Sequence, residues 1–328
     1  MSPKISVLTT VYTCEKYIAQ SIESILNQTF ADFEYIIVND GSTDDTYGII
    51  KDLASKDSRI IMINNEKNIG IVKSLNKALD IAKGKYIALQ DGDDISFPKR
   101  LEEQFMFLEN NQDYVLVGAN IIVMDEYENF ISEPMRPMNN QDAKFGLLFR
   151  CIFSHPSIMY SKKVIDDNNL RYDEEFIHAE DFKLITQISQ YGKIFNIRHP
   201  LIKYRKHSNN NSVLNQDILI NGSALIVKEN MANLGLNITI EQVLRIRDLI
   251  SSRGINTKSV YDDVKILFRA IKRFQEKLNS EKNSEILYTL KRMLKWLGKK
   301  NIILKPKYLS LYMSIKAYYY KESFFSSN

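Results

Sequence analysis

Regular alternation of short apolar runs with helical patterns dominates the first 125 residues and limits the folds open to this chain. Short β-branched or apolar runs predict strands at 5–9, 35–38, 60–63 and 86–89. Helical spacing or capping residues between them predict helices at 15–28, 43–56 and 70–82, and Pro98 opens another. Such alternation with short connections predicts an α/β fold, with a largely parallel sheet covered by helices on both faces.

The pattern changes further along the chain. Residues 142–213 indicate short helices and polar loops, and the rest is helical, near 215–233, 239–252, 258–279, 283–297 and 306–321. Breaks are expected at Gly235, Gly254 and Gly298, where glycine interrupts the helical pattern. We therefore predict two domains, an α/β domain over 1–213 and a helical region over 214–328.

Several classes of protein are disfavoured. No run of 18 apolar residues is present and the N-terminus has no signal-peptide pattern, so we expect a cytoplasmic protein without a membrane span. Cys14 and Cys151 lie far apart in no metal-ligand spacing, which indicates reduced thiols. The first strand–helix turn, Thr10 to Cys14, has neither a G-x-G-x-x-G pattern nor a Walker lysine, which disfavours dinucleotide and P-loop sites.

Polar residues gather where three predicted strands end. Thr10 and Tyr12 follow the first, Asp40 the second, and Asp91, Asp93 and Asp94 the fourth. Ligands of open α/β sheets bind at the carboxyl ends of strands. Aspartate and glycine also make ordinary turns, but three such loops together favour a binding site.

Asp91-Gly92-Asp93 places two carboxylates one residue apart, with a glycine that lets both turn toward one cation. Mg²⁺ or Mn²⁺ binds carboxylate and phosphate oxygens with few protein ligands. A cation there would neutralise a nucleoside diphosphate as it departs. The alternative is an acidic turn before the helix that follows Pro98.

Glu180-Asp181 opens a predicted helix. Acids in a first turn are favoured by the helix dipole, which is the structural alternative. As a functional pair, they would supply one catalytic base. Transfer of a sugar from a nucleoside diphosphate has a good leaving group, so one carboxylate suffices to take the proton of the attacking hydroxyl.

Taken in order, the segments of residues 3–213 resemble the family 2 glycosyltransferases, an inverting group with the GT-A fold. The resemblance rests on the run from Ile5 to Tyr12, Val38-Asn39-Asp40-Gly41-Ser42-Thr43-Asp44, Asn68-Ile69-Gly70 with Asn76, Leu89-Gln90-Asp91-Gly92-Asp93-Asp94, His155-Pro156-Ser157 and Glu180-Asp181. It implies a GT-A catalytic domain with a helical C-terminal extension.

The resemblance also implies roles for individual residues. The nucleotide-sugar site would comprise Thr10, Tyr12, Asp40, Asn68, Lys73, Asp91 and Gly92, and the metal would be held by Asp93 and His207. Asp181 would be the base, with Glu180 and His155 on the acceptor. The chain departs from the family pattern in three places. Thr10 stands where proline is usual and Thr13 where asparagine is usual. The family often has an arginine before Asn76, which is absent here, and Lys73 would take its place.

The C-terminal region is basic and aromatic. Nine Lys or Arg and no acid lie between Lys291 and Lys321, interleaved with Trp296, Tyr308 and Tyr312. Such a surface suits an anionic membrane, with aromatic rings at headgroup level. The alternative is a helical tail that packs on the catalytic domain. Nucleic acid is disfavoured because no recognition fold is visible.

The resemblance predicts transfer of a hexose from a UDP-sugar, UDP-glucose or UDP-galactose, to a GlcNAc- or GalNAc-diphospholipid. The expected product has a β linkage, β-1,3 being the specific expectation, in O-antigen, lipopolysaccharide or capsule assembly. The expected cofactor is Mn²⁺ or Mg²⁺. Alternatives are a UDP-GlcNAc or UDP-GalNAc transferase of the same fold, a sugar nucleotidyltransferase, and a non-catalytic carbohydrate-binding protein.

Overall fold

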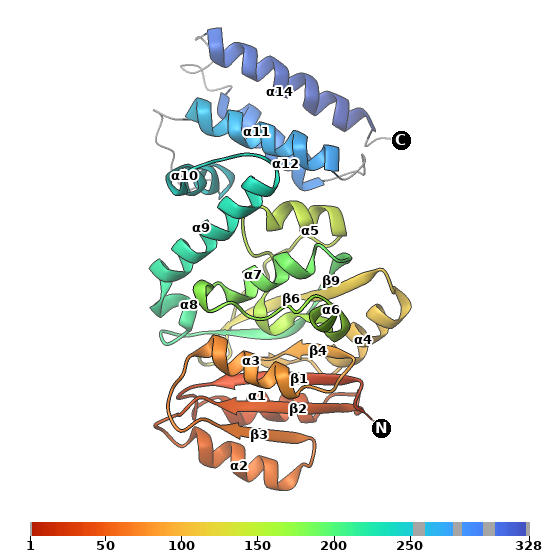
Figure 1. Cartoon of the computed structure of the whole chain (residues 1–328), viewed down its shortest axis with the longest axis vertical. Coiled ribbons are helices and arrows are strands. Elements are labelled where there is room, and N and C mark those ends of the chain that lie inside the picture. Colours follow the sequence, from red (N-terminus) through yellow and green to blue (C-terminus); the bar gives the residue numbers. More distant parts are fainter. Residues whose placement is uncertain (1, 252–259, 278–283, 298–305, 326–328) are drawn as a thin grey trace. The chain divides into compact units, whose positions relative to one another are not determined.

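A computed structural model describes residues 2–251, 260–277, 284–297 and 306–325. Its centre is a nine-stranded sheet with the strand order β3-β2-β1-β4-β8-β6-β9-β5, and β7 pairs with β6. The predicted α/β class is confirmed, and the sheet is flanked by helices (Figure 1).

The first four strands form the parallel part of the sheet. They are β1 (Ile5–Val11), β2 (Phe33–Asn39), β3 (Ile60–Asn64) and β4 (Tyr86–Leu89), connected by α1 (Ile18–Leu26), α2 (Thr46–Lys56) and α3 (Ile71–Ile81). The chain winds outward from β1 to β3 and returns to place β4 on the other side of β1. The carboxyl ends of β1 and β4 therefore border the crevice where such sheets bind ligands.

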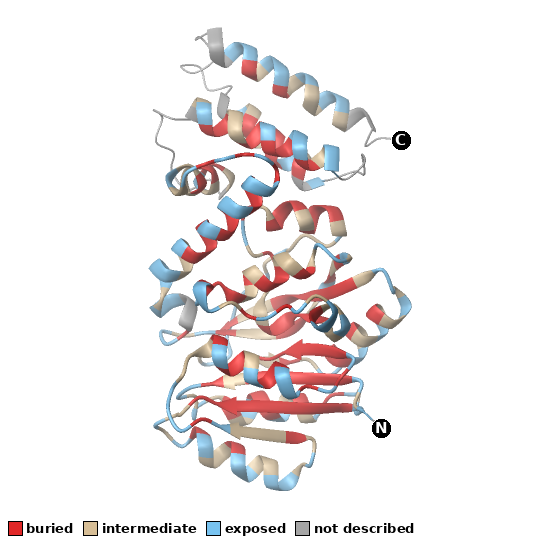
Figure 2. Cartoon of the chain, viewed as in Figure 1, coloured by how far each residue is buried: buried red, intermediate tan, exposed pale blue. Residues whose placement is uncertain are grey.

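Burial explains why these runs read as continuous apolar segments. All seven residues of β2 and all four of β4 are buried (Figure 2). Helices α1, α2 and α4 (Arg100–Asn110) share one core with one face of the sheet, through Ile22, Ile50 and Leu101. Helix α3 packs on β1 and β2 outside that core. A strand covered on both faces loses the alternation of apolar and polar residues.

Beyond β4 the sheet is mixed. The elements are β5 (Ile95–Ser96), β6 (Tyr114–Asp125), β7 (Phe130–Ser132), η1 (His155–Ser157), β8 (Met159–Ser161), α6 (Lys162–Asp167), η2 (Glu174–Phe176), α7 (Glu180–Ile188), β9 (Lys193–Lys206) and α8 (Asn211–Leu214). β8 is antiparallel to β4 and β6, whereas β9 is parallel to β6.

The prediction of short helices and loops over 142–213 was wrong for β8 and β9. β9 spans 14 residues, but His199-Pro200 interrupts it and its register against β6 shifts twice near that point. Proline cannot donate to a strand ladder, and Lys and Arg occur along the whole segment. The usual apolar signature of a strand is therefore missing.

The described chain forms two compact units. One comprises residues 1–140 and 151–222, and the other comprises residues 141–150 and 223–328. The second contains most of α5 (Asn140–Leu147) and of α9 (Gln216–Asn233), with α10 (Ile240–Ser251), α11 (Val260–Lys277), α12 (Ser284–Leu297) and α14 (Pro306–Phe325). The contribution of residues 141–150 to the helical unit had no signal in the sequence.

The C-terminal helices lie close to their predicted bounds. Gly235 has a φ of +71°, a backbone conformation that glycine adopts without strain, and it separates α9 from α10. The predicted breaks at Gly254 and Gly298 lie outside the described residues. Within the described ranges, no helix has the length and apolar character needed to cross a bilayer.

Candidate active site

The polar residues predicted at the strand ends lie at one edge of the sheet. Tyr12 follows β1, Asp40 follows β2 and Asp91 follows β4, and these three strands are neighbours (Figure 1). Because parallel strands end at the same edge, the topology brings the three loops together.

Asp40 is buried and organises the loop before α3. Its carboxylate accepts hydrogen bonds from the backbone N–H groups of Ile69 and Gly70, at 3.0 and 2.9 Å, and from Asn65 Nδ2 at 2.8 Å. A carboxylate has about four acceptor positions, so one remains for a ligand donor. Gly70 has a φ of +93°, which a residue with a Cβ adopts only with strain.

The other residues predicted for the nucleotide border this loop. Tyr12 is 50% exposed beyond the end of β1, and Thr10 is half-buried within it. Asn68 Oδ1 accepts from the backbone of Gly70 at 3.0 Å. Lys73 Nζ lies 3.4 Å from Glu174 Oε2, and both side chains are more than half exposed.

Gly92 is required by close packing in the acidic loop. A Cβ at this position would stand 2.4 Å from Val11 Cγ1, inside the core beneath β1. The loop is also bound to α1, because Ser21 Oγ donates to the carbonyl of Asp91 at 2.7 Å. The glycine thus lets the loop lie against β1, with the partly exposed carboxylates of Asp91 and Asp93 on either side of it.

Asp93 and His207 meet across the site. His207 Nε2 lies 2.9 Å from Asp93 Oδ2, and Asn210 Nδ2 donates to the same oxygen at 3.1 Å. Asn210 Oδ1 also accepts from the backbone of His207 at 2.7 Å, which holds this loop closed after β9. The two residues predicted as metal ligands are therefore in direct contact.

Arg205 is buried and holds the acidic loop in place. It is 2% exposed, and its backbone N–H donates to Asp94 Oδ1 at 2.7 Å while its Nε donates to the carbonyl of Asp93 at 3.0 Å. Its guanidinium lies 4.8 Å from the ring centre of Tyr17, which is 5.0 Å from that of His207. Burial and the charges of Asp93 and Asp91 raise the pKa of Asp94 well above its ordinary value.

The donor set fits a hard divalent cation. Asp91, Asp93 and Asp94 each offer one carboxylate oxygen, and these oxygens lie within 4.8 Å of one another. Oxygen ligands of this kind suit Mg²⁺ and Mn²⁺. Asp94 is fully buried and already accepts from Arg205, so Asp93 is the better placed ligand.

His155 connects Asp91 with the second acidic pair. Its Nδ1 lies 2.7 Å from Asp91 Oδ1. Burial lowers the pKa of His155, but the carboxylate of Asp91 more than offsets this and raises the pKa to about 9, with smaller contributions from Asp181 and Glu180. The side chain of His155 therefore lies between the acidic loop and the start of α7.

Glu180 and Asp181 occupy the first turn of α7, where the helix dipole favours negative charge. Burial and the charge of Asp181 raise the pKa of Glu180 to about 7. Burial also raises the pKa of Asp181, while the charge of His155 opposes that rise. His178, just before the helix, has a φ of +65°, a strained backbone of the kind found at functional sites.

Sequence reasoning had not singled out Arg205, Asn210 or Tyr17 for this site. Arg205 and Asn210 flank His207 in the sequence, so their proximity to a suspected ligand was the available signal. Tyr17 offered none, since its role depends on the packing of α1 against the end of β9. Of the predicted site residues, Asp91 contacts His155 and Asp93 contacts His207, while the charges of Asp181 and Glu180 act on the pKa of His155.

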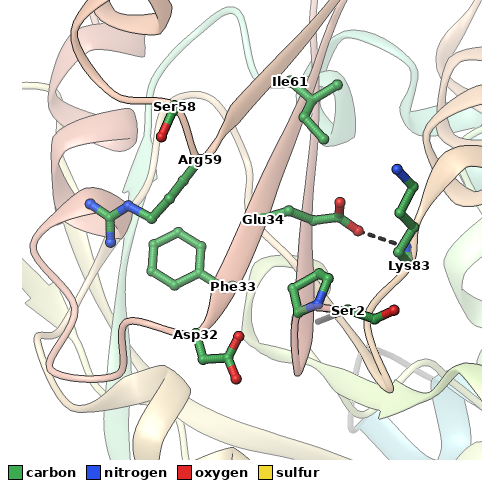
Figure 3. A pocket seen from close by; sticks show the side chains of 9 residues that line it. Ser2, Asp32, Phe33, Glu34, Ser58, Arg59, Ile61 and Lys83 are labelled. Atoms are coloured by element: carbon green, nitrogen blue, oxygen red, sulfur yellow. Dashed lines mark hydrogen bonds between the residues drawn. The ribbon is translucent and has the colours of Figure 1, made fainter.

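A separate hollow of about 560 Å³ lies at the opposite, amino-terminal edge of the sheet (Figure 3). Its lining residues are Ser2, Pro3, Asp32, Phe33, Glu34, Ser58, Arg59, Ile61 and Lys83. Glu34 accepts from Ser6 Oγ and from the backbone of Lys83, both at 2.6 Å, and Arg59 pairs with Asp57 at 2.7 Å. Glu34 and Arg59 are therefore engaged within the protein, and none of the residues predicted for the site lines this hollow.

Several known proteins are similar to this chain in sequence. Residues 6–168 match the model of the family described as glycosyl transferase family 2. An uncharacterized glycosyltransferase of Methanocaldococcus jannaschii is 42% identical over 211 residues, 62% of this chain and 71% of that protein. The O-antigen biosynthesis glycosyltransferase WbnJ of Escherichia coli is 40% identical over 165 residues, 49% of this chain and 63% of that protein.

Among solved structures, TarS 1-349 of S. aureus in complex with UDP-GlcNAc superposes with a TM-score of 0.59. The match covers 97% of this chain and 92% of TarS at 18% identity. At that identity the likeness concerns the fold, which is of the GT-A type.

Proposed function

This chain belongs to glycosyltransferase family 2, and on that premise we propose that it transfers a hexose from a UDP-sugar, with inversion, to a saccharide acceptor. The specific expectation is UDP-glucose or UDP-galactose as donor and a GlcNAc- or GalNAc-diphospholipid as acceptor. The product would be a β linkage, β-1,3 in the specific form, within O-antigen or capsule polysaccharide. The O-antigen enzyme WbnJ among its relatives supports this assignment.

The donor would bind along the strand ends. Asp40, Thr10 and Tyr12 would hold the nucleoside, Asn68 and Lys73 would border the diphosphate, and Asp91 with Gly92 would face the ribose and sugar. A divalent cation, Mn²⁺ or Mg²⁺, held by Asp93 and His207 would neutralise the departing diphosphate. The contact of Asp93 with His207 at 2.9 Å supports this pairing.

Asp181 would act as the base. The acceptor hydroxyl loses its proton to Asp181 as its oxygen forms a bond with the anomeric carbon, and the bond from that carbon to the diphosphate oxygen breaks on the opposite face. Inversion follows because there is a single displacement. Glu180 and His155 would contact the sugar hydroxyls around this point.

One observation carries the proposal: the contact of His155 with Asp91 at 2.7 Å, beside Glu180 and Asp181. This contact would join the metal-and-diphosphate end of the site to the proposed base. A nucleotidyltransferase has no need of a base at that place, and neither has a carbohydrate-binding protein. The alternative within the same fold is a UDP-GlcNAc or UDP-GalNAc transferase, and TarS bound to UDP-GlcNAc supports testing those donors.

The experiment is a UDP-release assay with a panel of UDP-hexoses and UDP-N-acetylhexosamines, synthetic lipid-diphosphate sugars as acceptors, and Mn²⁺, Mg²⁺ or chelator. We expect release to need metal and acceptor together. Asp181→Asn should retain UDP-sugar binding and lose transfer by about a thousandfold or more. Full activity of this variant would refute the assignment of the base, and the absence of release with every donor would refute the function.

A further inference from the structure

The guanidinium of Arg205 joins three segments around the proposed cation site. Its Nε donates to the carbonyl of Asp93 at 3.0 Å, and its Nη2 donates to Gln20 Oε1 on α1 at 2.6 Å. Its Nη1 donates to the carbonyl of Glu126, in the turn between β6 and β7, at 3.4 Å. These partners lie 112, 185 and 79 positions away in the sequence. One buried side chain thus holds together segments that the chain itself keeps far apart.

The backbone of Arg205 contacts the same site. Its N–H donates to Asp94 Oδ1 at 2.7 Å, and its carbonyl accepts from Asn210 Nδ2 at 3.2 Å. Asn210 in turn donates to Asp93 Oδ2 at 3.1 Å and accepts from the backbone N–H of His207 at 2.7 Å. Asp93 and His207, the two residues expected to hold the cation, are therefore both linked to Arg205 by hydrogen bonds.

Tyr17 adds a second link between Arg205 and His207. The guanidinium carbon of Arg205 lies 4.8 Å from the ring centre of Tyr17, and the ring centres of Tyr17 and His207 are 5.0 Å apart. A guanidinium is attracted to the face of an aromatic ring. The imidazole of His207 is thus restrained by a neighbouring ring as well as by its own backbone.

The charge of Arg205 by itself opposes a second cation nearby, because like charges repel. The ion pair of Arg205 with Glu128 is long, at 3.6 Å, and the carboxylate is 42% exposed, so it offsets little of this charge. Any benefit to cation binding must therefore come from geometry. Ligands that are already held in place lose less freedom when the cation binds. Charge and geometry predict effects of opposite sign.

We propose that Arg205 is a positioning residue, which holds Asp93 and His207 in place before the cation binds and strengthens cation binding despite its own charge. This inference rests on the proposed function, because it concerns the cation of the same site. Replacement of a side chain that holds metal ligands in place commonly lowers metal affinity by about 10- to 100-fold.

Three substitutions separate geometry from charge. Arg205→Lys keeps the charge but loses the planar fork that reaches three acceptors at once. Arg205→Met removes the charge as well. Gln20→Ala removes one acceptor of the guanidinium from the exposed surface of α1 and leaves Arg205 in place. This third variant keeps the proposal testable if neither Arg205 variant folds.

Arg59→Lys and Arg59→Met are the matched controls. Arg59 donates to the carbonyl of Leu26 at 3.0 Å, pairs with Asp57 at 2.7 Å and lies 4.6 Å from the ring centre of Phe33. It thus makes the same kinds of contact as Arg205. It lines the hollow at the opposite edge of the sheet, however, far from the proposed cation site.

Manganese EPR, with UDP at saturation, measures the Kd of Mn²⁺ without any turnover. We expect Arg205→Lys and Arg205→Met to raise this Kd by about 10- to 100-fold, and Gln20→Ala to raise it by a smaller factor. The Arg59 controls should stay within about twofold of the wild type. Excess Mn²⁺ should restore most of the kcat for UDP release in the Arg205 variants, because the ligands remain and only their placement is lost.

Two results would overturn the proposal. One is an unchanged Kd for Mn²⁺ in all the variants that fold, or tighter binding by Arg205→Met, since the charge of Arg205 would then matter more than its contacts. The other is an equal rise of the Kd in the Arg59 controls, which would reflect a general loss of stability.

Failure of the proposed function gives a different result. If the wild-type protein binds no Mn²⁺ in the presence of UDP, the cation site is refuted and the role of Arg205 with it. If the wild-type protein binds Mn²⁺ but releases UDP from no donor, the transfer function is refuted, while the Kd values of the variants still test the role of Arg205.

Discussion

Arg100 carries a positive charge into the core behind the acidic loop. It is fully buried, and its guanidinium donates to Gln90 Oε1 and Ser96 Oγ, both at 2.9 Å, and to the carbonyl of Leu89. Each of these acceptors is neutral. Burial lowers its pKa to about 9, while nearby Asp91 and Asp94 oppose this. The loop with three carboxylates thus has a fixed cation beneath it.

Replacement of Arg100 by Met is expected to lower the free energy of unfolding by about 3 kcal/mol, since it leaves several buried acceptors unpaired. Urea unfolding measures this change. Lys163→Ala is the control, because Lys163 pairs with Asp167 on an exposed helix surface and such pairs contribute about 0.5 kcal/mol or less. Equal effects of the two substitutions would contradict the importance of the buried network.

The protonation of Asp181 predicts how activity depends on pH. Its pKa is raised by burial, so it takes up a proton at a higher pH than an ordinary aspartate. A base works only when unprotonated, so kcat should fall as the pH drops through this raised pKa. His155 lowers that pKa, and a neutral His155→Asn should therefore move the acidic limb of the kcat profile to higher pH. An unmoved limb would show that Asp181 does not titrate there.

At the scale of elements, Asn76 shows how α3 positions the segment before the base. Its Nδ2 donates to the carbonyl of Tyr172 at 2.9 Å, and its Oδ1 accepts from the backbone N–H of Tyr172 at 3.0 Å. The side-chain amide thus pairs with the backbone as a strand would. These two bonds hold the segment that leads through η2 to α7. Asn76, a residue of the family pattern, therefore acts by positioning that segment.

Asn76→Ala should reduce the free energy of unfolding by about 1–2 kcal/mol, because both hydrogen bonds are lost. It should also lower kcat severalfold. The Kd for UDP should be retained, since Asp40 contacts Ile69 and Gly70 before α3 and does not depend on Asn76. Steady-state kinetics and UDP titration measure the two effects. Asn111→Ala, which removes one bond to Phe107 at the end of α4, should leave kcat unchanged.

On the scale of the whole molecule, the helical unit exposes both basic and apolar side chains. Lys291 and Lys295 of α12 are exposed, and α14 buries Leu311 and Ile315 while it exposes Leu309, Met313 and Tyr320. Of the aromatic and basic residues expected to gather here, Lys299, Lys300 and Lys305 lie outside the described residues. Exposed apolar residues beside lysines are typical of helices that lie on anionic membranes.

We expect the protein to sediment with vesicles that contain an anionic lipid, and to be released as salt is raised. Lys291→Glu, Arg292→Glu and Lys295→Glu together should weaken binding by more than about tenfold, since each basic residue near such a surface contributes about 1 kcal/mol. The control carries Lys51→Glu, Lys99→Glu and Lys163→Glu, three exposed lysines of the other unit. Equal binding by both variants, or binding to neutral vesicles alone, would exclude an electrostatic membrane surface.

Local chemistry determined much of this protein from the sequence. Strand β4, the start of β3 and the end of α2 lie where apolar runs and turn residues indicated, because periodicity and turn chemistry act over a few residues. Because Asp40, Asp91 and Asp93 directly follow such apolar runs, the sequence also identified them as residues at strand ends. For β9 this reasoning failed, since charged residues and Pro200 hide a strand that is defined by its pairing with β6.

Only the tertiary structure decided which of these residues meet. His155 reaches Asp91 across 64 positions of sequence, and Arg205 reaches Asp94 across 111. These contacts depend on the insertion of β8 between β4 and β6 and on the parallel pairing of β6 with β9. Strand order and register are set by the packing of the whole sheet, whereas the patterns in a sequence report only on neighbours along the chain.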